Sequence, residues 1–276
     1  MAHTDGGRDP PHRIGRGLNP LLYGLARFCW LNSHSLKLNS AKSEFLLFGS
    51  KTQLSKIDIN SISFSGMTIN VSQTCRNLGV MLDRNMTMSH QISSICRSVR
   101  YQLRNIGFIR KYLNRSSTEK LVHASISSRL DFGNSILFNL PQTQLATLQR
   151  LQNAAARIIS LSKKYTHITP ILKSLHWLQV RDRIIFKILL LTFHCVHSTA
   201  PQYNIDLVHN YTPVRSLRSS NSGSLVITKF PTTWGTRVFA HAGPSLWNNL
   251  PLAIKHCSSL ESFKSSLKTH LFNATF

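Results

Sequence analysis

The fold is decided by one stretch, LATLQRLQNAAARIIS (145–160), continued by HITPILKSLHWLQV (167–180) and RDRIIFKILLLTFHCVH (181–197). The first and last segments carry apolar residues at helical spacing. The last is apolar almost all round, which predicts the most buried helix of the chain over Asp182 to His197. The middle segment is a compact linker in which Pro170 opens a short helix. Because no nucleophile motif or phosphate loop occurs here, we expect a packing centre rather than a catalytic one.

The linker carries two histidines and a tryptophan, His167, His176 and Trp177. The histidines flank the short helix and could touch each other, so we expect a structural group rather than a catalytic one. A second pattern, His194-Cys195-x-His197, is a weak metal-binding signal. On a helix the two histidines share a face that the cysteine does not, and we expect no metal there.

The charge of the chain is strongly basic: 33 Lys and Arg face 10 Asp and Glu among 276 residues, for a formal net charge of +23. A polyanion is the partner that such a charge favours, and nucleic acid is the commonest polyanion. The alternative is a basic protein without a particular partner.

A row of cations follows one face of the helix predicted from Ser89 onward. Apolar residues form one stripe of this helix, and a second stripe, roughly 130° away at 100° per residue, holds Arg97, Arg100, Arg104 and Lys111, with Arg115 shortly after. Such a row can follow a sugar–phosphate backbone. The alternative is a solvated helix face, but almost no acidic residue is interleaved to pair with these cations. We therefore predict a nucleic-acid-binding surface.

Acidic residues are too few and too scattered for polymerase or nuclease chemistry from this chain alone. Neither Asp-Asp nor Asp-x-Asp occurs, so we expect no two-metal site, no catalytic residue and no bound cofactor. Asp83 and Asp131 each end an apolar segment, where a capping role or an arginine partner is the expected one.

The five cysteines are odd in number and form no Cys-x-x-Cys, which is typical of a reducing compartment. Residues 1–20 are rich in Gly, Pro and Arg, and they lack the apolar centre of a secretory signal. The apolar run from Ile184 to Val196 is too short to cross a membrane and contains Lys187. We expect an intracellular protein of the cytoplasm or nucleus, without a membrane partner.

The pattern of elements predicts an α+β fold that is predominantly helical, with a small antiparallel sheet near the N-terminus. A helix is expected at 21–36 and strands at 44–49, 57–64, 67–71, 78–82 and 225–230. Capping boxes predict helix starts at Ser116 and Ser258. We divide the chain into a disordered head (1–20), a sheet region (21–88), a helical region (89–160), a buried helical core (161–209) and a C-terminal segment (210–276).

Several segments carry a family resemblance in their order along the chain: NSHSLKLNSAKSEFLLFG (32–49), NLGVMLD (77–83), SRLDFGNSIL (128–137), LQRLQNAAARII (148–159), the linker and helix at 167–197, AP-x-Y (200–203), RSLRSS (215–220), GPSLWNNLP (243–251) and SLESFKSSLKTHLF (259–272). Together they resemble the C-terminal half of the reverse transcriptase of non-LTR retrotransposons, the long interspersed elements of the chicken-repeat and jockey type.

The resemblance implies that residues 28–83 are the end of a polymerase palm and that 89–160 are the thumb. It implies a C-terminal region that helps to bind RNA, and an RNA or RNA–DNA template–primer duplex as partner. Residues 62–82 then correspond to the hairpin that grips the primer, with Phe64, Gly66, Met67, Leu78 and Gly79 as its candidate residues.

The family's tyrosine–x–aspartate–aspartate turn, which holds two Mg²⁺ ions in the complete enzyme, has no counterpart in residues 1–20. Smaller departures are Ser43, Phe132-Gly133 and Gln179, which stand where the family has threonine, tyrosine–cysteine and proline. We therefore expect a reverse transcriptase fragment that is not an enzyme as it stands. The alternatives are a non-catalytic RNA-binding or scaffold protein derived from a retroelement, and a genomic remnant without function.

Overall fold

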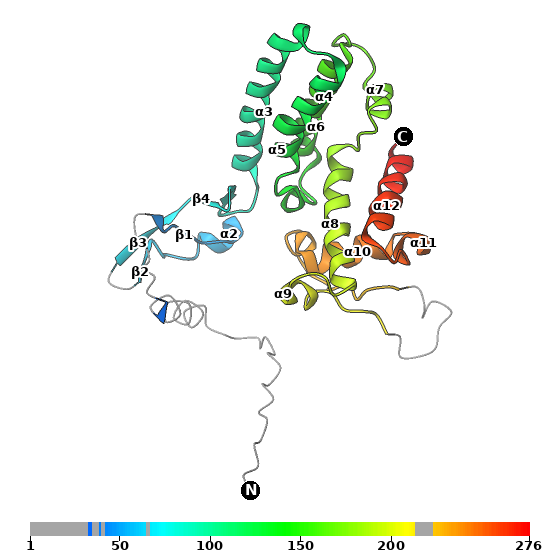
Figure 1. The fold of residues 1–276 in the computed structure, drawn as a ribbon. Helices are drawn as coiled ribbons and strands as arrows, with labels where there is room; N and C mark the ends of the chain where they lie inside the picture. The colour runs from blue at the N-terminus through cyan, green and yellow to red at the C-terminus, as the bar shows by residue number, and fades with distance from the viewer. Residues whose placement is uncertain (1–32, 35–38, 40–41, 65–66, 213–222) are drawn as a thin grey trace. The chain divides into compact units, whose positions relative to one another are not determined.

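The fold is described from a computed structural model, which describes residues 33–34, 39, 42–64, 67–212 and 223–276 (Figure 1). The predicted head, nearly all of the helix expected at 21–36 and the segment RSLRSS lie outside the described residues. The chain forms two compact units, 1–75 and 76–276, which are treated separately below. It is predominantly helical with small sheets, and the predicted α+β class is confirmed at that level.

The first unit is built on a three-stranded sheet of order β1-β3-β2. β2 (Ser61–Phe64) and β3 (Met67–Ser72) form the predicted antiparallel hairpin, whereas β1 (Phe45–Leu46) pairs with β3 in parallel. The prediction of an antiparallel sheet is therefore wrong for β1. A parallel neighbour requires a long crossover, and the chain between β1 and β3 supplies one that includes the short helix α2 (Lys51–Leu54).

The second unit begins within β4 (Thr74–Asn77), which pairs with β5 (Val80–Asp83). The two residues between them, Leu78 and Gly79, have φ of 46° and 87°, and a two-residue type I′ hairpin turn needs positive φ at both positions. The strand predicted over 78–82 is thus displaced, because its first two residues form a turn. This turn is tight: a Cβ at Gly79 would lie 3.2 Å from a ring carbon of Phe132.

Helices make up most of the second unit. After β5 the chain forms α3 (Ser89–Ile109), α4 (Arg115–Val122), α5 (Ser128–Asp131), α6 (Gln142–Ser160), α7 (Ile168–Ser174), α8 (Val180–Val196), α9 (Gln202–Ile205), α10 (Phe239–Asn248), α11 (Leu252–Lys255) and α12 (Leu260–Thr275). In the described part of this unit, short 3₁₀ turns lie at Arg110–Tyr112, Asn134–Leu137 and Gly235–Arg237. Within the described residues, no helix is both long and apolar enough to cross a membrane.

The helix predicted over 116–130 is formed by α4 and α5, which are joined by a π-helical turn at His123–Ser127. Its predicted capping box is wrong. Asn114 is the N-cap, its side chain accepts the backbone N–H of Ser117 at 2.8 Å, and Glu119 instead pairs with Arg115. The amide of Asn114 fulfils the capping role that the sequence assigned to Ser116.

The helix α8 joins the two hydrophobic cores of the second unit. Val180, Ile184 and Ile188 pack in the core formed with α3 and α6, and Leu189 and Phe193 pack in the core formed with α10 and α12. The phenyl ring of Phe193 stacks on that of Phe263 with a centroid separation of 4.4 Å. The stretch expected to be a packing centre therefore holds both cores together, because α8 is apolar on opposite sides.

The C-terminal segment differs from prediction in two places. No strand forms at 225–230; only Leu225 makes a bridge, to Asn210, and the side-chain amide of Asn248 bonds both the N–H and the C=O of Leu225. That amide satisfies the backbone groups that a second strand would otherwise pair. The helix α12 is capped by Ser259 and not by Ser258, since its hydroxyl accepts the N–H of Ser262.

Candidate nucleic-acid interface

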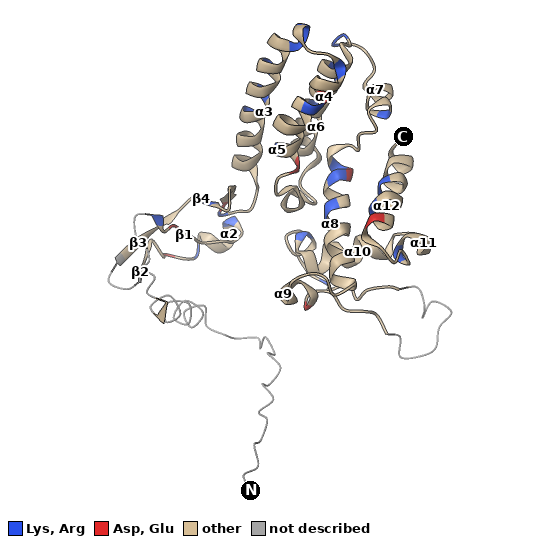
Figure 2. Cartoon of the chain, viewed as in Figure 1, with Lys and Arg blue, Asp and Glu red and all other residues tan. Residues whose placement is uncertain are grey.

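The exposed face of α3 is the most distinctive charged surface of the second unit. Ile92, Ile95, Val99 and Ile106 are buried on one side of this helix, and Arg97, Arg100 and Arg104 are exposed on the other. The sequence of α3 contains no acidic residue, and Figure 2 shows how sparse Asp and Glu are beside Lys and Arg. Among the described residues, no carboxylate lies within ion-pair distance of these three guanidinium groups.

Aromatic side chains alternate with the cations along the same face. Tyr101 and Phe108 are 64% and 66% exposed, and Arg104 lies 5.9 Å from the ring centroid of Phe108. Tyr112 is 78% exposed just beyond the helix, with the ammonium of Lys111 4.8 Å from its ring centroid. Cations interleaved with exposed rings are typical of surfaces that bind nucleic acid, because phosphates pair with the cations and bases stack on the rings.

The start of α3 is set by Asp83 at the end of β5. Its carboxylate accepts the backbone N–H of Thr87 at 2.9 Å and that of Met88 at 2.7 Å. Met88 is the N-cap, with φ of 60°, and its buried side chain has no oxygen that could accept a capping hydrogen bond. Asp83 therefore holds the two residues that lead directly into α3.

A second helix completes the interface. The helix α6 packs against α3, and between their N-terminal halves lies a groove of about 560 Å³. Its rim carries Arg97 and Arg100 from α3 and hydroxyl or amide groups from both helices: Ser89, Ser93, Thr143, Gln144 and Thr147. Hydroxyl, amide and guanidinium donors are the groups that most often contact phosphate oxygens.

Arg150 of α6 belongs to the same surface. Its guanidinium donates to the hydroxyl of Thr147 at 3.0 Å. Burial raises the pKa of the Cys96 thiol at the floor of the groove, and the nearby charges of Arg100 and Arg150 oppose that rise. The charges of two arginines from different helices thus both lower the pKa of one thiol in the groove. Sequence reasoning missed Arg150, since only the packing of α6 on α3 brings it there.

The remaining predicted cations have different surroundings. Lys111 is exposed in the 3₁₀ turn after α3, and Arg115 is engaged by Glu119 at 2.9 Å. Arg110, which the sequence did not single out, donates to the carbonyl oxygens of Ile158 at 2.8 Å and Ile159 at 3.0 Å. It holds the C-terminal end of α6 and is a structural residue rather than a surface cation.

The residues predicted for a primer-gripping hairpin do not form one hairpin in the described structure. The backbones of Phe64 and Met67 are paired in the register of β2 and β3, and Gly66 lies outside the described residues. Leu78 and Gly79 form the turn between β4 and β5 in the second unit, where Leu78 is 89% exposed. The two groups therefore belong to separate hairpins.

The residues predicted as structural lie around α8. Asp131 accepts two hydrogen bonds from the guanidinium of Arg183, at 2.9 and 2.7 Å. The ring of His176 stacks on Phe272 with a centroid separation of 6.0 Å, and the buried Trp177 meets His123 edge-on at 5.5 Å.

His167 is the N-cap residue of α7, and no hydrogen bond joins it to His176. The expected histidine pair is thus replaced by separate contacts of His176 and Trp177 with neighbouring rings. In the part of the chain that the structure describes, no three His, Cys, Asp or Glu side chains are grouped so as to hold a metal ion.

Comparison with models of protein families, with curated proteins and with solved structures finds no match to this chain.

Proposed function

We propose that this chain binds an RNA–DNA or RNA duplex through the cationic, aromatic face of α3 and the adjoining groove with α6. One observation carries the proposal: Arg97, Arg100 and Arg104 are exposed, lie on one face and have no acidic partner among the described residues. An unpaired row of this kind can neutralise phosphates and release the cations condensed around a nucleic acid.

The dimensions of the row fit a duplex. Arg97 to Arg104 span seven residues of helix, or about 10 Å at 1.5 Å per residue. A duplex carries one charge per roughly 1.7 Å of axis, so about six phosphate charges lie within that length. Three guanidinium groups at this spacing, with Arg150 beside them, can therefore contact several phosphates at once.

The resemblance to non-LTR retrotransposon reverse transcriptases extends this proposal to a biological role. In that role, α3 to α6 act as the thumb that contacts the template–primer duplex, and the first unit is the end of the palm. The chain then binds nucleic acid without incorporating nucleotides on its own, and it acts in the cytoplasm or the nucleus. The resemblance supports this proposal through ordered sequence motifs, and the geometry supports it through the charge of α3.

The proposal is tested by charge reversal. A labelled RNA–DNA hybrid is titrated with wild-type protein and with the Arg97→Glu/Arg100→Glu/Arg104→Glu variant, and binding is followed by fluorescence anisotropy. We expect the triple variant to bind at least about tenfold more weakly, since three charge-assisted contacts become repulsive.

The matched control is a variant with the same net charge but with the reversals elsewhere in the second unit: Lys187→Glu, Lys229→Glu and Lys268→Glu, all at exposed positions. It should retain most of the affinity for the hybrid. An equal loss of affinity in both variants would show that binding depends on the net charge of the chain and not on the face of α3. Unchanged affinity in the α3 variant would favour a scaffold role in which the basic charge is incidental.

A further inference from the structure

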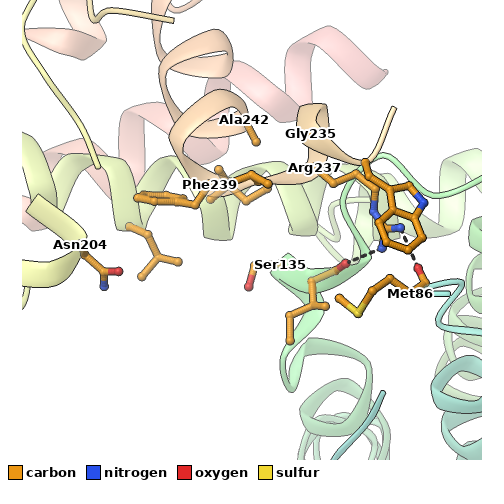
Figure 3. A pocket seen from close by; sticks show the side chains of 12 residues that line it. Met86, Ser135, Asn204, Gly235, Arg237, Phe239 and Ala242 are labelled. Carbon is orange, nitrogen blue, oxygen red and sulfur yellow. Dashed lines mark hydrogen bonds between the residues drawn. The ribbon is translucent and has the colours of Figure 1, made fainter. Parts of the chain in front are cut away.

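A cavity of about 510 Å³ lies within the second unit, away from the face of α3 (Figure 3). It is bordered by α8, by α10 with the 3₁₀ turn before it, by the turn at Asn134–Leu137, and by Asn204 of α9. Its volume falls within the range of about 300–1,000 Å³ that is typical of ligand pockets.

The walls of the cavity are mainly apolar. The cavity is lined by Ile188 and Leu191 of α8, by Val238 and Phe239 at the start of α10, and by Trp234. Trp234 is 37% exposed and Val238 45% exposed, which is much open surface for such side chains. An apolar hollow of this size with exposed apolar side chains among its lining residues favours an apolar ligand.

One charged group borders this apolar space, the guanidinium of Arg237. It donates to the carbonyl oxygen of Met86 at 2.7 Å and to that of Ile136 at 3.4 Å. A guanidinium has five N–H groups, so these bonds fix its orientation and leave further donors available. In Figure 3 Arg237 lies at one end of the cavity and Asn204 at the other.

The charge of Arg237 has no partner that neutralises it directly. Among the described residues no carboxylate lies within 4 Å of Arg237, and the nearby Asp83 already accepts hydrogen bonds from Thr87 and Met88. Burial lowers the pKa of Arg237, and the charge of Asp83 partly opposes this effect. A half-buried cation beside apolar walls is costly unless an anion approaches it.

We propose that this cavity binds a small monocarboxylate with an apolar body, whose carboxylate pairs with Arg237 and whose body lies along α8 and α10 toward Asn204. The carboxylate would accept from the guanidinium donors that Met86 and Ile136 leave free, and the apolar body would cover Leu191 and Phe239. A neutral apolar compound would make the contact with Leu191 and Phe239 but not the hydrogen bonds to Arg237. None of the lining residues of this site belongs to α3 or α6.

The test compares octanoate with 1-octanol, which has the same chain length and no charge. Both are titrated into the full chain by calorimetry. We expect octanoate to bind saturably to the wild type and at least about tenfold more weakly to Arg237→Gln, because a charge-assisted hydrogen bond is lost. Octanol should bind both proteins equally. Octanoate should also change tryptophan fluorescence in the wild type but not in Trp234→Phe.

Two further variants guard against misfolding as an explanation. Leu191→Trp adds bulk inside the cavity and should weaken octanoate and octanol alike, whereas Lys187→Trp adds bulk at an exposed position of α8 outside the cavity and should leave both unchanged. Arg237→Lys keeps the charge and should retain part of the octanoate preference. The proposal is overturned if wild type shows no saturable octanoate binding, if Arg237→Gln binds octanoate as well as wild type, or if Leu191→Trp has no effect.

Discussion

Two arginines six residues apart, Arg104 and Arg110, should behave in opposite ways when each is replaced by glutamine. Both substitutions remove one positive charge from the same end of α3. Arg104 is exposed and lies over the Phe108 ring, whereas Arg110 donates to carbonyl oxygens at the end of α6. Arg104→Gln should therefore weaken binding, and Arg110→Gln should weaken the fold.

The magnitudes follow from these contacts. Hydrogen bonds to a charged group contribute about 1.5–3 kcal/mol each, so the loss of the two bonds from Arg110 to α6 should cost about 3 kcal/mol at the lower end of that range. For a unit of this size that lowers the melting temperature by roughly 6–12 °C. For Arg104→Gln the melting temperature should stay within about 2 °C, as is usual for an exposed surface position.

The binding measurement is the slope of log Kobs against log salt concentration. One phosphate contact accounts for about 0.7–0.9 of that slope, so Arg104→Gln should reduce it by nearly one. Arg110→Gln, measured well below its melting temperature, should leave the slope unchanged. Equal slopes for the two variants, or an unchanged melting temperature for Arg110→Gln, would refute the division into a surface cation and a structural one.

Three other outcomes are expected. Leu148→Ala, at a fully buried position of α6, should lower the free energy of unfolding by about 2–5 kcal/mol in denaturant titrations. Gly79→Ala should cost about 1–2 kcal/mol in the same assay, because φ is +87° and the added Cβ meets the ring of Phe132. Burial raises the pKa of Asp182, so the native state holds that proton more tightly than the unfolded chain, and the stability from this residue falls as pH rises above the ordinary carboxyl range. Asp182→Asn should therefore gain more stability over wild type at pH 7 than at pH 4, and an equal difference at both values would contradict this.

The long helices could be predicted from sequence because their apolar faces are long and regular. The spacing of Ile92, Val99 and Ile106 predicted α3 with its start at Ser89, and the apolar run of α8 predicted the element that joins both cores. Helix starts were harder. Asn114, Ser116 and Ser117 lie close together at the start of α4, and Ser258 and Ser259 precede α12. The choice among such residues depends on backbone geometry that local sequence does not determine.

The interface could be predicted only in part. The stripe of arginines is visible in sequence because helical periodicity alone places it on one face. The contributions of Arg150 and Thr147 are not visible, since they reach the groove through the packing of α6 on α3. The structural role of Arg110 is hidden for the same reason: its acceptors lie 48 and 49 residues further along the chain.

The most direct test of the proposed function is the salt dependence of binding to an RNA–DNA hybrid, compared between wild type and the Arg97→Gln/Arg100→Gln/Arg104→Gln variant. If the face of α3 contacts phosphates, the slope of log Kobs against log salt concentration should become shallower by about 2–3 in the variant. Identical slopes, with or without a uniform loss of affinity, would contradict binding through this face.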